Sequence, residues 1–89
     1  MIAAKPTITT LALTTANTDY SLNIPSGVNR FEIKERSGAA LVRLYTTSGG
    51  GYITVPYGAS YAENDVKGGF TLIVQTDTNG TTLEIKYWK

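Results

Sequence analysis

Apolar residues alternate with polar ones in short runs along the whole chain, and no segment has the 3.6-residue apolar period of an amphipathic helix. The alternation is clearest over residues 20–24, 31–34, 70–75 and 83–88, where every second position is apolar. A period of two places the apolar side chains on one face of a β-strand. The pattern therefore predicts an all-β protein.

Weaker alternation predicts further strands. Residues 8–13 form a threonine-rich first strand of imperfect register. Residues 41–45 carry apolar side chains on both faces, which is typical of a strand that is central in its sheet or covered on its second side. A short strand over residues 52–55 and a brief edge strand over residues 60–62 follow, and we expect the polar residues 63–69 to form a loop.

Glycine, asparagine and proline mark the turns between these strands. Between the last two strands lies Asp77-Thr-Asn-Gly80, and an Asn-Gly pair readily takes the positive φ angles of a tight hairpin. We therefore predict that the strands over residues 70–75 and 83–88 form a β-hairpin. The glycine run at 48–51 lacks the Lys-Ser/Thr pair and the helix of a phosphate-binding loop, so we expect an ordinary inter-strand loop there.

About seven to eight short antiparallel strands are predicted, at the spacing of about 8–12 residues that small all-β domains show. In a chain of 89 residues this number fits a compact β-sandwich, jelly-roll-like in topology, or a small closed barrel. No linker divides the chain, so we expect residues 1–89 to form a single β-domain, with residues 1–6 as a flexible N-terminal arm.

The chain contains no histidine and no cysteine. General acid–base and nucleophilic catalysis draw most often on these residues, so we expect a protein that is not an enzyme and uses no cofactor. A carboxylate pair could still hydrolyse a glycosidic bond. However, Glu32 and Glu84 occupy outward positions of predicted strands and are better explained by cross-strand charge pairing on a solvated face.

Eight basic and seven acidic residues give a net charge of +1, and no run of one sign occurs. A small barrel that binds single-stranded nucleic acid needs a basic groove. Four basic residues could line one: Arg30, Lys34, Arg36 and Arg43. With so little net charge we nevertheless expect no nucleic-acid partner. We also expect no signal peptide and no membrane partner, because the longest apolar stretch, residues 39–42, is far too short to cross a bilayer.

Two acidic segments raise the question of a metal site. Glu63, Asn64 and Asp65 form the first segment, and Asp77 and Asn79 lie in the predicted hairpin turn. Their oxygens could bind Ca²⁺ if the two loops met in space. The spacing matches no EF-hand, and such residues are common in turns because their side chains hydrogen-bond to the backbone. We therefore expect no metal site, and leave Ca²⁺ near Glu63, Asp65 or Asp77 as an open alternative.

The aromatic residues divide into two groups. One group falls on the apolar faces of predicted strands and is expected in the core: Tyr20, Phe31, Phe70 and Tyr87. The other falls on the opposite faces or in loops: Tyr45, Tyr52, Tyr57, Tyr61 and Trp88. Exposed tyrosine and tryptophan offer a large contact area with a polar group, which favours protein interfaces or sugar stacking. We predict four contact residues: Trp88, Tyr57, Tyr61 and Tyr52.

A family resemblance extends over nearly the whole chain. The segments that carry it, in order, are Leu11-Ala-Leu-Thr-Thr-Ala-Asn-Thr-Asp-Tyr20, Ile24-Pro-Ser-Gly27, Arg30-Phe-Glu-Ile-Lys34, Ala40-Leu-Val-Arg43, residues 52–56, Tyr61-Ala-Glu-Asn64 and Leu83-Glu-Ile-Lys-Tyr-Trp88. In this combination they resemble a group of small virion proteins of tailed bacteriophages. Similar proteins vary in length at residues 48–51 and 63–69.

The resemblance implies a β-rich structural protein of the virion, either a capsid decoration (cement) protein or a head–tail accessory protein, made in the host cytoplasm. It implies as partners the major capsid protein or other virion proteins, and we expect a homo-oligomer. It supplies no catalytic residues. An alternative from a different class is a small carbohydrate-binding β-sandwich, in which sugar rings would stack on Tyr45, Tyr52, Tyr57 or Trp88.

Overall fold

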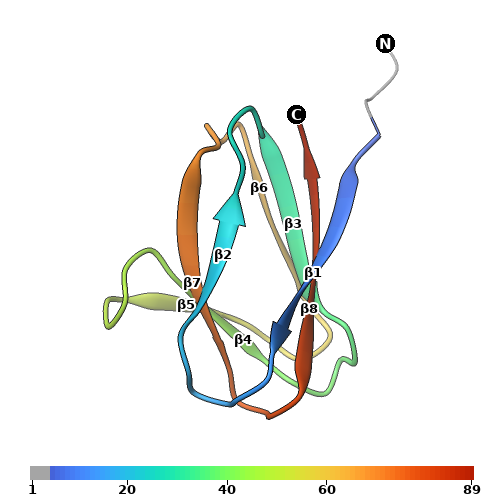
Figure 1. The fold of residues 1–89 in the computed structure, drawn as a ribbon. Coiled ribbons are helices and arrows are strands. Elements are labelled where there is room, and N and C mark those ends of the chain that lie inside the picture. The colour runs from blue at the N-terminus through green and yellow to red at the C-terminus, as the bar shows by residue number, and fades with distance from the viewer. Residues whose placement is uncertain (1–4) are drawn as a thin grey trace.

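The computed structural model describes residues 5–89, which form eight β-strands in two four-stranded sheets packed face to face (Figure 1). The first sheet has the strand order β1-β8-β3-β6, the second has the order β2-β7-β4-β5, and all neighbouring strands are antiparallel. The strands are β1 (Thr7–Leu13), β2 (Tyr20–Ile24), β3 (Arg30–Glu35), β4 (Val42–Tyr45), β5 (Tyr52–Val55), β6 (Ser60–Asn64), β7 (Phe70–Thr76) and β8 (Thr81–Trp88).

The strand order is that of an eight-stranded jelly roll. The first strand pairs with the last, β2 with β7, β3 with β6 and β4 with β5, as if one long antiparallel hairpin were folded into a sandwich. Within residues 5–89, the β4–β5 connection alone joins strands of one sheet, and every other connection crosses between the sheets. The prediction of an all-β sandwich with jelly-roll-like topology is confirmed.

The predicted C-terminal hairpin is wrong. β7 pairs with β2 and β4, whereas β8 pairs with β1 and β3 in the other sheet, so residues 77–80 cross between the sheets. Gly80 does adopt a positive φ of 74°. At the crossing, the buried Thr76 and Thr81 hydroxyls lie 3.2 Å apart, and Thr81 Oγ1 donates to the carbonyl oxygen of Thr78 at 2.6 Å. A turn sequence that supplies positive φ thus serves a crossing as well as a hairpin.

The core lies between the two sheets and uses the inward positions of both. Ile33 of β3 faces Ile85 of β8, and both side chains are buried. In the opposite sheet Val42 and Val74 are fully buried. The remaining buried members of this cluster are Leu13, Leu22, Ile24, Val28, Phe31, Leu44, Val55, Leu72 and Leu83. Burial of these apolar side chains is the main source of stability for the fold.

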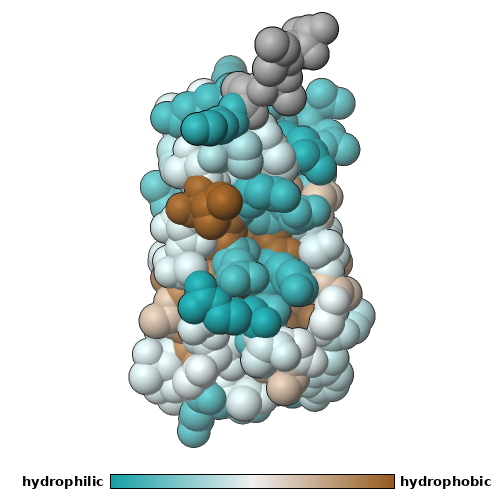
Figure 2. All heavy atoms as spheres, turned by 90° about the vertical axis from the view of Figure 1, so that its right-hand side faces the viewer, coloured by the Kyte–Doolittle hydropathy of each residue, from teal (hydrophilic) through white to brown (hydrophobic). Residues whose placement is uncertain are grey.

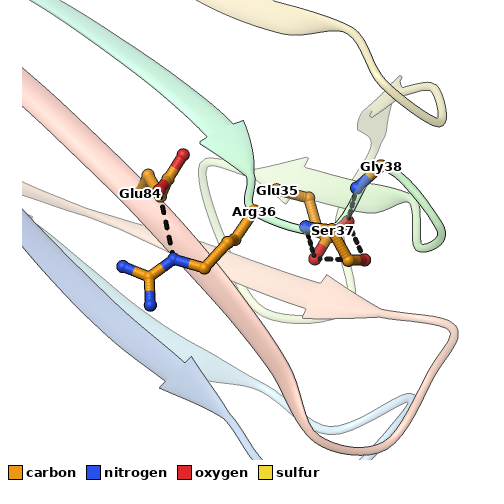
Figure 3. A network of polar contacts seen from close by, with 5 residues as sticks. All are labelled: Glu35, Arg36, Ser37, Gly38 and Glu84. Carbon is orange, nitrogen blue, oxygen red and sulfur yellow. Dashed lines mark hydrogen bonds and ion pairs between the residues drawn. The ribbon is translucent and has the colours of Figure 1, made fainter.

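A buried carboxylate organises the connection between β3 and β4. The Glu35 side chain accepts backbone hydrogen bonds from Ser37 at 2.9 Å and Gly38 at 2.8 Å, and one from Ser37 Oγ at 2.7 Å (Figure 3). It also accepts a backbone hydrogen bond from Ala40 at 3.3 Å. Burial alone raises the pKa of Glu35, but the hydrogen bonds to its charged form outweigh this effect and lower the pKa. The alternating pattern predicts a strand that ends at residue 34, one residue before the end of β3, and gives no sign of the role of Glu35.

The outer face of the first sheet is mainly polar, as the surface on the β1 and β8 side of the molecule shows (Figure 2). Glu32 pairs with Lys86 at 3.3 Å between Oε1 and Nζ, and Arg36 pairs with Glu84 at 3.1 Å (Figure 3). The predicted charge pairing of Glu32 and Glu84 is confirmed. Exposed pairs of this kind contribute about 0–1 kcal/mol each to stability.

The basic residues considered for a nucleic-acid groove do not share one face. Arg30 and Lys34 alternate with the buried Ile33 and lie on the outer face of the first sheet. Arg43 precedes the buried Leu44 and lies on the outer face of the second sheet. Because the two outer faces point in opposite directions, these residues form no common groove.

β6 extends to Asn64, so the predicted loop at 63–69 begins two residues later. The predicted arm at residues 1–6 lies mostly outside the described residues. Residues 5–89 include no helix with the length and apolar character needed to cross a membrane.

Candidate binding site

An apolar cavity opens between β5 and β6, which are edge strands of opposite sheets. Its volume is about 500 Å³, within the range of about 300–1,000 Å³ that is usual for ligand sites. We call it the β5–β6 cavity. Its lining includes Phe31, Leu44, Tyr52, Ile53, Tyr61 and Glu63.

One wall of the cavity comes from β4 and β5. Tyr45 and Tyr52 face each other across these strands, with ring centres 5.0 Å apart. Tyr52 is 54% exposed and Ile53 is 46% exposed, whereas Tyr45 is buried. Tyr45 lies on the face of β4 opposite to Leu44, as predicted, but it is not exposed, because the Tyr52 ring packs on it. The sequence gives no sign of the exposure of Ile53, because its inward register opposite Leu44 is that of an ordinary core residue.

The opposite wall is aromatic as well. The Phe31 ring lies 6.3 Å from that of Tyr61 and 6.4 Å from that of Phe70, measured between ring centres. Tilted and edge-on pairs at this separation are the favoured arrangement of aromatic side chains. Tyr61 was assigned to an outer face or loop, but it is half-buried and packs against the core. Three strands, β3, β6 and β7, therefore supply this wall.

Glu63 is the one charged side chain among the described residues that line the cavity. It lies opposite Phe31 in the β3–β6 pairing and so projects to the inner side of the sheet. The Tyr61 hydroxyl donates a hydrogen bond to the Glu63 carboxylate. Burial, this hydrogen bond and the nearby negative charge raise the pKa of Tyr61 to about 12. The rim of the cavity is therefore acidic and its walls are apolar.

The four predicted contact residues lie in three places. Tyr52 and Tyr61 line the β5–β6 cavity. Tyr57, in the turn after β5, donates its hydroxyl proton to Asp77 at 2.8 Å. Trp88 lies on the outer face of the first sheet, where the guanidinium carbon of Arg30 is 4.2 Å from the ring centre. The structure thus brings together two of the four residues.

The acidic segments considered for calcium lie apart. Glu63 and Asp65 precede β7, and Asp77 follows it. A strand of seven residues spans about 23 Å, so the two segments cannot share one ion. Asp77 already accepts hydrogen bonds from Tyr57 and from the backbone of Leu41, and the first of these contacts lowers its pKa. Residues 5–89 contain no group of three or more Asp, Glu, His or Cys side chains that could hold a metal ion.

A second feature is a polar network on the outer face of the second sheet. Arg43 Nη1 donates to Asn17 Oδ1 at 3.0 Å, and Gln75 Nε2 donates to Asp19 Oδ1 at 2.7 Å. The Tyr45 hydroxyl lies 3.4 Å from Gln75 Oε1. Ordered polar side chains beside aromatic rings can hydrogen-bond to sugar hydroxyls and stack on sugar rings.

The β5–β6 cavity combines apolar walls, tyrosine hydroxyls and a single carboxylate, which suits the binding of an apolar or cationic group. No family model, no curated protein and no solved structure matches the chain.

Proposed function

We propose that the chain is a non-enzymatic structural protein of a tailed-bacteriophage virion, either a capsid decoration protein or a head–tail accessory protein, that acts through protein–protein contacts. The resemblance of its segments to small virion proteins supports this proposal. The jelly-roll topology is compatible with it, because viral capsid domains are among the proteins that use this fold.

The exposed apolar edge at the β5–β6 cavity is the observation that carries the proposal. Tyr52 and Ile53 are both about half exposed beside an apolar cavity. β5 is an edge strand that contains neither a charged residue nor a proline, the features that usually protect sheet edges from other chains. Such an edge suits a partner that adds a strand and inserts side chains between the sheets.

The partner would be the major capsid protein or another virion protein, and a second copy of the chain would make the homo-oligomer that we expect. Tyr52 and Tyr61 are the contact residues at the cavity. Tyr57 and Trp88 would serve separate contacts, because they lie at other parts of the surface. Several contact regions on one small domain would allow it to join neighbouring subunits of a repetitive shell.

The copy number of the chain in purified phage particles tests this proposal. Hundreds of copies per particle are expected for a shell decoration protein, and about a dozen or fewer for a component of the neck or tail. Washed particles that lack the chain would contradict the proposal.

A carbohydrate-binding module is the second candidate, and the polar network beside Tyr45 favours it. Here sugar hydroxyls would bind Arg43 and Gln75, with a ring stacked on Tyr52. Binding of a soluble polysaccharide by the isolated chain, weakened by Tyr52→Ala and by Arg43→Ala, would support this candidate. Polysaccharide binding that neither substitution affects would contradict it.

A further inference from the structure

The charge of the β5–β6 cavity restricts what it can bind. Glu63 belongs to neither of the two ion pairs found within residues 5–89, which are Arg36–Glu84 and Lys86–Glu32. Its contact in the cavity is the Tyr61 hydroxyl, which is neutral at pH 7 and therefore does not balance the charge of the carboxylate. The carboxylate therefore lies at the exposed rim of the apolar walls, and within residues 5–89 no basic side chain forms an ion pair with it.

Aromatic rings reinforce this preference. Phe31, Tyr45, Tyr52, Tyr61 and Phe70 line the cavity. The face of an aromatic ring carries negative charge density and attracts cations, with a strength that increases as water is excluded. Rings and a carboxylate in one apolar cavity thus favour a cation that has an apolar stem.

We infer that the β5–β6 cavity binds a basic side chain, arginine or lysine, of the protein partner. The aliphatic stem packs against Ile53 and Leu44, and the charged end reaches Glu63 and the tyrosine rings. Arginine and lysine commonly bury their stems on apolar surfaces while their charged ends stay at the rim. This inference rests on the proposed function for the source of the side chain, and on the cavity alone for its chemistry.

Two small probes test the inference on the isolated chain. n-Butylguanidinium carries the stem and charge of an arginine side chain, and n-butylurea is its neutral counterpart of the same shape. Titrations followed by two-dimensional NMR are expected to shift the signals of Ile53, Tyr52 and Tyr61, with n-butylguanidinium binding at least about fivefold more tightly.

Glu63→Gln removes the charge and keeps the size of the side chain. We expect it to weaken n-butylguanidinium binding by about fivefold and to leave n-butylurea binding unchanged. Glu84→Gln is the matched control, because it removes one negative charge from β8, on the outer face of the same sheet and away from the cavity. It is expected to leave the binding of both probes unchanged. Tyr52→Ala, at an exposed position, is expected to weaken the binding of both probes.

Equal binding of the two probes to the wild-type chain would overturn the inference, as would a Glu63→Gln variant that prefers the cation as strongly as the wild type does. Because this experiment needs no particle, failure of cation binding would leave the virion proposal intact. Absence of the chain from purified particles would instead contradict the virion proposal and leave the cation preference of the cavity intact.

Discussion

Arg30 lies over the ring of Trp88, with its guanidinium carbon 4.2 Å from the ring centre, and the two residues face each other across β3 and β8. Arg30 Nε also donates to Asn64 Oδ1 at 2.7 Å, which fixes the guanidinium in place. The Trp88 ring is therefore partly covered within the chain itself. Its role in stability can be measured separately from any role in contacts.

Trp88→Ala is expected to lower the free energy of unfolding by about 2 kcal/mol, because it removes a large half-buried ring. A double-mutant cycle with Arg30→Ala, measured by urea denaturation, is expected to give a coupling of about 0.5–1 kcal/mol. No coupling would mean that the cation and the ring do not interact.

The predicted contact role of Trp88 is tested separately, by sedimentation and particle-binding assays of Trp88→Ala. Unchanged assembly of this variant would exclude that role.

Glu35→Gln is expected to destabilise the fold by about 2 kcal/mol at neutral pH, because the amide NH2 replaces one of the two oxygens and then lies against the backbone donor of either Ser37 or Gly38. Glu32→Gln is the matched control, since it removes a charge from an exposed ion pair and is expected to cost at most about 1 kcal/mol. Chemical denaturation at pH 7 provides the comparison. Equal losses in the two variants would contradict the structural role of Glu35.

The pH dependence of stability follows from the lowered pKa of Glu35. Its usual value is 4.5, so the stabilisation is fully present above that pH and is lost as the pH falls through the lower value of the folded state. Below the usual pKa, the wild-type chain is therefore expected to lose stability more steeply than Glu35→Gln. Parallel curves of unfolding free energy against pH from 7 to 3 would contradict this expectation.

Tyr61 provides a spectroscopic measure of the charge at the cavity rim. Its pKa is raised to about 12 by burial, by the hydrogen bond to Glu63 and by the charge of that carboxylate. Glu63→Gln removes the charge, so the pKa of Tyr61 is expected to fall. Ultraviolet titration at alkaline pH, with Tyr61→Phe to assign the signal, provides the measurement. An unchanged titration of Tyr61 would contradict the predicted contact.

Gly68→Ala is expected to destabilise the chain by about 3 kcal/mol or more, because an added Cβ would lie 2.0 Å from the carbonyl oxygen of Pro25. The β6–β7 connection packs closely against the β2–β3 connection at this point, where Gly68 also donates its N–H to the Val28 carbonyl at 2.9 Å. Gly51→Ala is the control, since its added Cβ would meet nothing within 4 Å. Similar thermal midpoints for the two variants would contradict the packing at Gly68.

The sequence predicts the positions of the strands better than it predicts which strands pair with each other. Alternation over residues 70–75 and 83–88 identifies β7 and β8, because inward apolar residues such as Val74 and Leu83 are core in either topology. The Asn-Gly turn between them gives positive φ at Gly80 but carries no information on whether the chain folds back or crosses. The crossing depends on the pairing of β7 with β2 and β4 and of β8 with β1 and β3. These pairings join residues that are far apart in the sequence.

The candidate site is only partly predictable for the same reason. Tyr52 and Tyr61 are aromatic and near turns, so the sequence singles them out. By contrast, the sequence pattern predicts Ile53 to be an ordinary inward-facing strand residue and Glu63 to be an ordinary acidic residue of a loop. Their importance depends on β5 and β6 being the edges of opposite sheets, which is a property of the whole topology.

The claim that the β5–β6 edge docks the chain onto a virion is tested most directly by competition during particle assembly. Wild-type and Ile53→Ser chains, supplied in equal amounts, are quantified in purified particles by mass spectrometry after both are shown to be folded. Ile8→Ser is the control, because Ile8 is even more exposed, at 73%, but lies on β1. We predict that Ile53→Ser is depleted by about fivefold or more while Ile8→Ser is incorporated like the wild type. Equal incorporation of all three chains would contradict the account.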